Sequence, residues 1–200
     1  MPKLTYGAAL FPCAALALVA GSASAQTNEA GELSYINCEA GFGVIFPRAP
    51  MMRDVRYTTN TGAMVPARQF YLEEGGKRLM VTVARFGSGP LIDEAAMKHA
   101  ADTLKARGEL RYEAAGAYDP GFPGIQLNIF PNANQQLRAS VYMMEHKLYI
   151  IEALAPPSDV EALQFEQSIT LVNEIGVDYD QNPPDPIHKL TCRPAQYFRR

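Results

Sequence analysis

The sequence predicts an α+β fold, in which an antiparallel sheet of about seven strands is flanked by two helices. Most of the chain consists of short runs in which apolar and polar residues alternate, the pattern of half-buried strands. Turn signals rich in Gly, Asn and Pro join these runs as in hairpins, which favours antiparallel pairing. Only two stretches, 93–107 and 158–172, repeat apolar residues at helical spacing.

The predicted strands share this alternation and end at glycine, proline or polar turn residues. They are residues 41–47, 54–59, 65–73, 79–84, 109–115, 125–130, 137–144 and 148–154. Asn60-Thr61-Gly62 and Gly75-Gly76 have the composition of hairpin turns. Before the first strand, the polar segment 26–34 is expected to lack regular structure.

Both predicted helices carry signals at an end. Gly108 is expected to end the first helix as a left-handed C′ residue. Ser158-Asp159-Val160-Glu161 matches a capping box, in which Ser158 would be the N-cap of the second helix. The buried face of that helix is expected to carry apolar residues at helical spacing: Ala162, Phe165, Ile169 and Val172.

The first 25 residues are predicted to be a secretory signal peptide, which leaves 26–200 as a single globular domain. Lys3 supplies a positive charge, an apolar run follows, and Ala23-Ser24-Ala25 has the small-residue pattern that signal peptidase cleaves. The run is shorter than the about 20 residues that a membrane span needs. We therefore expect an exported protein, periplasmic or secreted, with no stable membrane anchor after cleavage; a retained N-terminal anchor is the alternative.

Two cysteines, Cys38 and Cys192, remain near the two ends of the mature chain. Because an exported protein meets an oxidising environment, a structural disulfide between them is predicted. It would stabilise the fold by up to about 5 kcal/mol in the chain-entropy model. It would also tie an irregular, proline-rich C-terminal tail, 176–200, to the start of the domain. Two free thiols are the alternative.

Composition and motifs argue against several functional classes. A net charge of −3 gives no reason to expect nucleic acid binding. The chain has no glycine-rich nucleotide loop, so no cofactor is expected. Gly87-Ser88-Gly89 falls one residue short of a nucleophile elbow and precedes Pro90 instead of a helix.

The three histidines are scattered over the chain and lack metal-binding spacing. Glu145 and His146 stand between two strand-like runs, so they are predicted to form a hairpin tip and not a catalytic pair. No catalytic or metal-binding residue is assigned. An active site would require distant side chains to converge, and the candidates are His99, Asp119, His146 and His188.

Six arginines place positive charge on the N-terminal half of the chain. They are Arg48, Arg53, Arg56, Arg68, Arg78 and Arg85. Charged strand edges that resist edge-to-edge pairing are the simpler interpretation. A patch for an acidic partner is the alternative.

Two motifs resemble those of a family of exported proteins. Phe42-Gly43-Val44-Ile45-Phe46-Pro47-Arg48-Ala49-Pro50 has the pattern F-x-V-x-F-P-x-x-P of an opening strand, and Phe165-Glu166-Gln167-Ser168-Ile169 has the pattern F-x-x-S of a closing helix. The chain is thereby similar to the PsbP-like superfamily, which includes the PsbP extrinsic subunit of photosystem II. The resemblance covers residues 42 to about 172. It implies an α/β/α sandwich and a binding or assembly module, and no functional residue carries over from it.

The sequence as a whole predicts a soluble exported accessory or binding protein that acts through contacts with a protein partner of unknown identity. One alternative is a hydrolase or metal-dependent enzyme whose site is assembled from distant residues. A second alternative is a small-ligand carrier, which would need an apolar cavity between the sheet and the helices.

Overall fold

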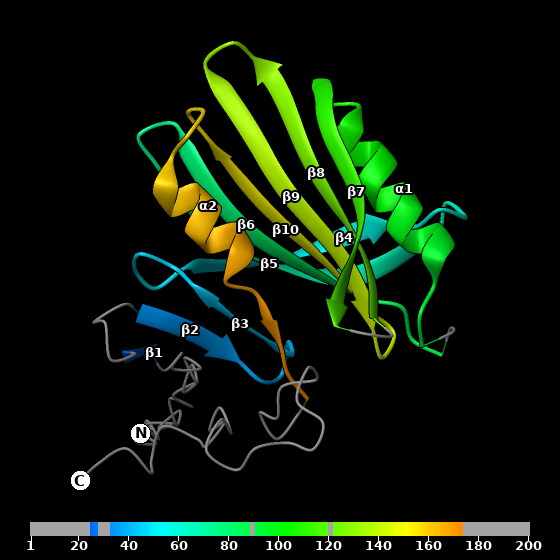
Figure 1. The fold of residues 1–200 in the computed structure, drawn as a ribbon. Coiled ribbons are helices and arrows are strands. Elements are labelled where there is room, and N and C mark those ends of the chain that lie inside the picture. The colour runs from blue at the N-terminus through cyan, green and yellow to red at the C-terminus, as the bar shows by residue number, and fades with distance from the viewer. Residues whose placement is uncertain (1–24, 28–32, 89–90, 120–121, 174–200) are drawn as a thin grey trace, which may run out of the picture.

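The computed structural model describes residues 25–27, 33–88, 91–119 and 122–173. Its centre is a seven-stranded antiparallel sheet of order β4-β5-β6-β10-β9-β8-β7 (Figure 1). The strands are β4 (Met51–Thr58), β5 (Met64–Glu74), β6 (Lys77–Arg85), β7 (Glu109–Asp119), β8 (Phe122–Asn132), β9 (Gln135–Met144) and β10 (Lys147–Ala155). The predicted α+β class and the predicted size of the sheet are confirmed.

One helix covers each face of this sheet, as in an α/β/α sandwich (Figure 1). Helix α1 (Glu94–Lys105) covers β8 and β9, and α2 (Val160–Gln167) lies on the opposite face over β9 and β10. A second, smaller sheet shares the α2 side. It has the order β1-β2-β3-β11 and consists of β1 (Ala25–Thr27), β2 (Leu33–Asn37), β3 (Phe42–Ile45) and β11 (Thr170–Leu171).

The two apolar layers meet at the central strand β10. Leu148 and Ile150 pack into the α1 layer, and Tyr149 and Ile151 pack into the α2 layer. Successive side chains of a strand point to opposite faces, so a strand buried on both faces needs apolar residues at nearly every position. This accounts for the nearly unbroken apolar run of β10.

The start of the second helix differs from the prediction. Ser158 has φ +69°, and Asp159 is the N-cap, whose Oδ1 accepts a hydrogen bond of 2.8 Å from the Ala162 N–H. Glu161 does not reach back to the cap but pairs with Lys77 at the start of β6. The predicted capping box is therefore wrong by one residue, because the next residue offers a carboxylate in the same place.

Two further expectations are wrong. Helix α2 ends at Gln167, and the buried Ile169 lies on the segment that leads into β11. The segment 26–34 was expected to be irregular, but it contributes to β1 and β2. Tyr35 of β2 is buried against the rings of Phe42, Phe46 and Phe70, so the small sheet completes the α2 layer.

Gly108 serves a different purpose from the predicted helix C′ position. Its φ is not left-handed, and an added Cβ would lie 2.5 Å from the Phe130 carbonyl oxygen. The glycine is therefore required by the close approach of two backbones, where the chain passes from α1 to the edge of the sheet.

Several predictions concern residues outside the described ranges. These are the signal peptide before Ala25, the C-terminal tail 176–200, and Cys192 with its disulfide to Cys38, and all three stay predictions. Among the residues that the structure describes, no helix is both long enough and apolar enough to cross a membrane.

The first prediction concerns the α2 layer. Phe165 is fully buried and its ring lies 4.8 Å from that of Phe46, so Phe165→Ala is expected to destabilise the fold by about 3–5 kcal/mol. Val160→Ala on the same helix is the control, because Val160 is exposed and should change stability by less than about 0.5 kcal/mol. Urea unfolding measures both, and equal effects would contradict the packing of α2.

The second prediction concerns the cap of α2. Burial by itself raises the pKa of Asp159, but the Ala162 N–H and the Lys77 ammonium, 2.9 Å away, outweigh it, so the pKa lies below its ordinary value. A carboxyl with a lowered pKa contributes stability above its unfolded pKa of 3.8 and loses it as the pH falls toward the folded value.

Asp159→Asn keeps the cap and removes the charge. We expect it to lower the free energy of unfolding by about 1 kcal/mol at pH 7, and we expect this difference from the wild type to shrink by pH 3. Urea unfolding at both pH values is the measurement. A difference that does not change with pH would show that the carboxylate charge contributes nothing.

Candidate functional site

A pocket of about 390 Å³ opens on the α2 side of the sheet, where β4, β5 and β6 approach the β2–β3 turn. Apolar side chains line part of it, among them Ala40, Pro66 and Val83. Its charged lining consists of three arginines and two carboxylates: Arg56, Arg68, Arg85, Glu39 and Asp54. We call it the arginine pocket.

The strand register brings these side chains together. Arg68 of β5 lies opposite Asp54 of β4 and Val83 of β6, so the three share one face of the sheet. Arg56 and Arg85 each follow two residues along their strands, which keeps them on that face. Three of the six arginines noted in the sequence therefore converge, although up to 29 residues separate them.

Pro66 separates two strands at the pocket. The pairing of β5 with β6 ends at Ala67 and Ala84, while β6 continues and pairs Arg85 with Lys147 of β10. The next pair in the register would be Pro66 with Arg85, and proline has no N–H to donate to a ladder. The ladder stops there, and the pocket lies at this point.

The β2–β3 turn forms the wall of the pocket. The Ala40 N–H donates to Asn37 Oδ1 at 2.9 Å, and the Tyr149 hydroxyl donates to the Ala40 carbonyl at 3.1 Å. Gly41 has φ +88°, and an added Cβ would lie 2.6 Å from the Tyr149 hydroxyl, so glycine is required. Burial raises the pKa of Tyr149 well above its ordinary value, so its hydroxyl remains a donor. These contacts hold Glu39 at the rim.

The charges of the pocket are only partly neutralised. Arg68 Nε lies 2.7 Å from Asp54 Oδ1, and Arg85 Nη2 lies 3.3 Å from Glu39 Oε1. Arg56 donates to the Met64 carbonyl at 3.3 Å, and it forms no ion pair with a carboxylate of the described residues. The pocket therefore carries one excess positive charge, and Arg56 is the cation that can bind a carboxylate of another molecule.

The other three arginines have different surroundings. Arg48 pairs with Glu74 at 3.1 Å, and Arg78 lies 3.6 Å from the buried Glu152. Arg53 lies on the opposite face of β4, where its Nε donates to Gln69 at 2.7 Å.

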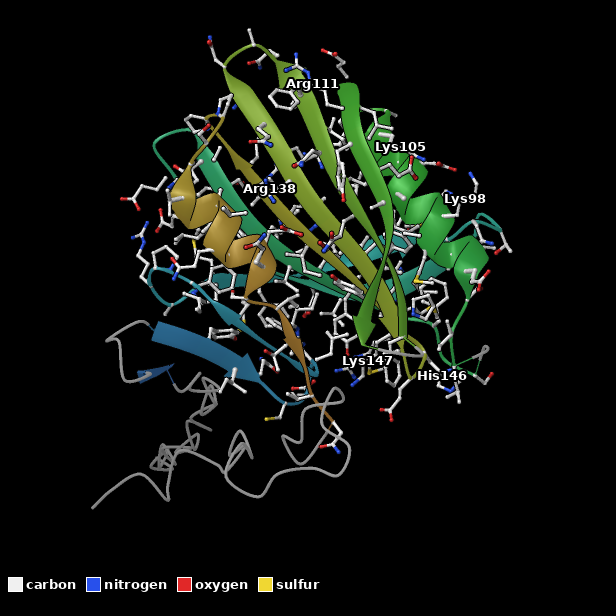
Figure 2. The ribbon with its side chains drawn as sticks, in the orientation of Figure 1. Lys98, Lys105, Arg111, Arg138, His146 and Lys147 are labelled. Carbon is white, nitrogen blue, oxygen red and sulfur yellow. The ribbon has the colours of Figure 1, made fainter. Side chains whose placement is uncertain are left out.

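The hairpin predicted at Glu145 and His146 is confirmed. Both residues have positive φ, +49° and +64°, and Met144 pairs with Lys147 across them, as in a two-residue type I′ turn. The backbone of His146 also accepts a hydrogen bond from Phe86 and donates one to Leu91. Figure 2 shows His146 and Lys147 at the end of the sheet opposite to Arg111.

The histidines form no metal group within the described residues. His99 on α1 is half-buried, with Nε2 3.2 Å from the Thr58 carbonyl. Asp119 is described only as part of the backbone of β7, and His188 lies outside the described ranges. Among the described side chains, no three His, Cys, Asp or Glu residues are grouped so that they could hold a metal ion.

Comparisons with known proteins bear on the fold. No family model matches the chain, and no curated protein matches it. Its structure is similar to the solution structure of cyanobacterial PsbP (CyanoP) from Synechocystis sp. PCC 6803, with 18% sequence identity and a TM-score of 0.46. The match covers 78% of this chain and 98% of that chain. The likeness concerns the fold alone.

The third prediction compares how much the pocket arginines and a buried carboxylate contribute to the stability of the fold. Side chains of Arg68 and Arg85 are 41% and 50% exposed, so alanine at either should change stability by at most about 1 kcal/mol. Glu152 is 8% exposed between Arg78 and Arg107, and Glu152→Ala should cost about 1–3 kcal/mol because it leaves two partly buried guanidinium groups without their carboxylate. Urea unfolding of the three variants tests this. Comparable losses would mean that the pocket arginines serve the fold.

Proposed function

We propose that the protein is an exported accessory or binding protein that acts through protein–protein contacts, and that the arginine pocket is its contact site. The observation that carries the proposal is Arg56, which has no carboxylate partner among the described residues although apolar side chains line the same pocket. A guanidinium presents paired N–H groups that match a carboxylate, and arginine is enriched at the energetically dominant positions of protein interfaces.

The exposure of the rim favours a macromolecular partner over a small ligand. Small-molecule sites bury most of the surface of their ligand. Here the carboxylates of Glu39 and Asp54 are 68% and 76% exposed, and a partner surface could cover them while one acidic side chain enters between the arginines. The predicted signal peptide supports export, and the predicted disulfide is consistent with it.

The fourth prediction tests this function with a charge reversal. The tagged protein is produced in its own source, crosslinked gently, and purified with whatever it contacts. We expect the wild type to recover a specific partner and Arg56→Glu to lose it, because the reversed charge repels an acidic side chain.

Lys98→Glu is the matched control, since Lys98 is 71% exposed on the outer side of α1 (Figure 2). Helix α1 covers the face of the sheet opposite to the one that carries the pocket. If the wild type, Arg56→Glu and Lys98→Glu all recover the same partner, the pocket is ruled out as the contact site. A stoichiometric metal ion in the purified protein, with no partner, would instead favour the metal-dependent enzyme.

A further inference from the structure

The two outer strands of the seven-stranded sheet present different edges. The pairing of β7 with β8 is interrupted by register shifts between Leu110 and Tyr112 and between Ala117 and Asp119. The eight residues of β4 pair with β5 without a shift, and none of them is proline. Proteins commonly protect sheet edges with bulges, prolines or charged side chains. Of these features, β4 has only the charged residues, so its regular edge is a candidate for pairing with a strand of complementary charge.

The hydrogen-bond pattern shows which backbone groups face outward along β4. Thr59 follows β4, and its N–H donates to Ala63 at 2.8 Å, so the odd-numbered residues of β4 bond toward β5. The N–H and C=O groups of Met52, Asp54 and Arg56 consequently face away from β5, toward the open edge.

Thr58 is the next residue in this outward-facing series. Its carbonyl oxygen lies 3.2 Å from Nε2 of His99, so α1 reaches the outer edge at this end of β4. The contact supports the assignment of outward groups, and it shows that His99 closes the edge at Thr58. The stretch from Met52 to Arg56 remains open among the described residues.

The side chains along this stretch favour an acidic strand. Arg53 and Arg56 lie on opposite faces of β4, and neither forms an ion pair with a described carboxylate. Arg53 also stacks 4.6 Å from the centre of the Tyr71 ring. Met51 and Met52 at the open end are 50% and 49% exposed, and methionine adapts to varied apolar partners.

We propose that an extended acidic segment of a partner protein adds to β4 as an eighth strand of the sheet, beside Met52, Asp54 and Arg56. This inference rests on the proposed function, since Asp54 and Arg56 belong to both the arginine pocket and the edge. Backbone hydrogen bonds would hold the segment, and its carboxylates would meet Arg56 on one face and Arg53 on the other.

A second copy of the chain fits the edge less well. Two β4 strands would bring four arginines together with only two aspartates. The symmetric antiparallel register that pairs Asp54 with Arg56 has its centre at Val55, and it places Met52 against Thr58. The Thr58 carbonyl is already in contact with His99, so that register would lose a hydrogen bond at each end.

The fifth prediction uses two substitutions at one edge position. Asp54→Ala and Asp54→Pro both remove the carboxylate and with it the hydrogen bond from Arg68. Only proline also removes the outward N–H, and neither disturbs a backbone hydrogen bond to β5. The probe is a synthetic eight-residue peptide of alternating Glu and Val, and alternating Lys and Val is its charge control. Calorimetric titration and amide hydrogen exchange of the full chain are the measurements.

We expect the acidic peptide to bind the wild type, and to bind Asp54→Pro at least ten-fold more weakly than Asp54→Ala, which lacks the same carboxylate. Bound peptide should slow exchange at the amides of Met52, Asp54 and Arg56. If Asp54→Pro does not fold, Met52→Pro against Met52→Ala repeats the comparison at another outward N–H.

Three results would overturn the inference: equal affinity of the proline and alanine variants, equal binding of the lysine peptide, or a wild-type dimer joined through β4. The proposed function fails separately. A natural partner lost by Arg56→Glu but kept by Asp54→Pro would leave the pocket as the contact site and rule out strand addition.

Discussion

The structure depends on the burial of both faces of β10 at the centre of the sheet. Tyr149 and Ile151 face one apolar layer, and Leu148 and Ile150 face the other. A strand with apolar residues on both faces leaves large apolar areas in water unless each face is covered. Exposed apolar surface costs about 25 cal/mol of free energy for every Å². The helices on opposite faces are the response to this constraint, and the central strands are the ones that they cover.

Each cover is also held by one buried carboxylate. Glu166 of α2 contacts Ser140 and lies 3.4 Å from Arg138, both on β9. On the other face, Glu152 of β10 contacts Arg107, which follows α1. Buried ion pairs add little stability compared with apolar packing, but a wrong placement would leave a charge unpaired. We interpret the two carboxylates as determinants of where the helices dock.

The limited area that the helices cover also explains where the pocket and the open strand edge lie. Helix α2 has only eight residues and lies over β9 and β10, and the small sheet shares the same face. The β2–β3 turn of the small sheet meets β4, β5 and β6 at the pocket. Pro66 ends the pairing of β5 with β6 there, and the pocket lies next to it. Among the described residues, the outer edge of β4 is closed at the Thr58 carbonyl by the contact with His99. A pocket and an open strand edge therefore adjoin in one corner of the molecule.

The sequence by itself determined the local elements of this protein. Alternation of period two located the strands of the main sheet, and helical spacing located α1 and α2, although α2 ends at Gln167. The charged residues at Glu145 and His146 identified the hairpin tip, since these signals depend only on neighbours along the chain. The strand around Tyr35 was missed because its alternation is short and lies in a polar segment.

Only the tertiary structure decided the cap of α2 and the pocket. Ser158 and Asp159 can both cap a helix, and the ammonium of Lys77, a residue distant in sequence, lies against Asp159. The convergence of Arg56, Arg68 and Arg85 depends on register, and a slip by one residue would turn an arginine to the other face. Register follows from the packing of the whole sheet, and alternation within one strand carries no information about its partner.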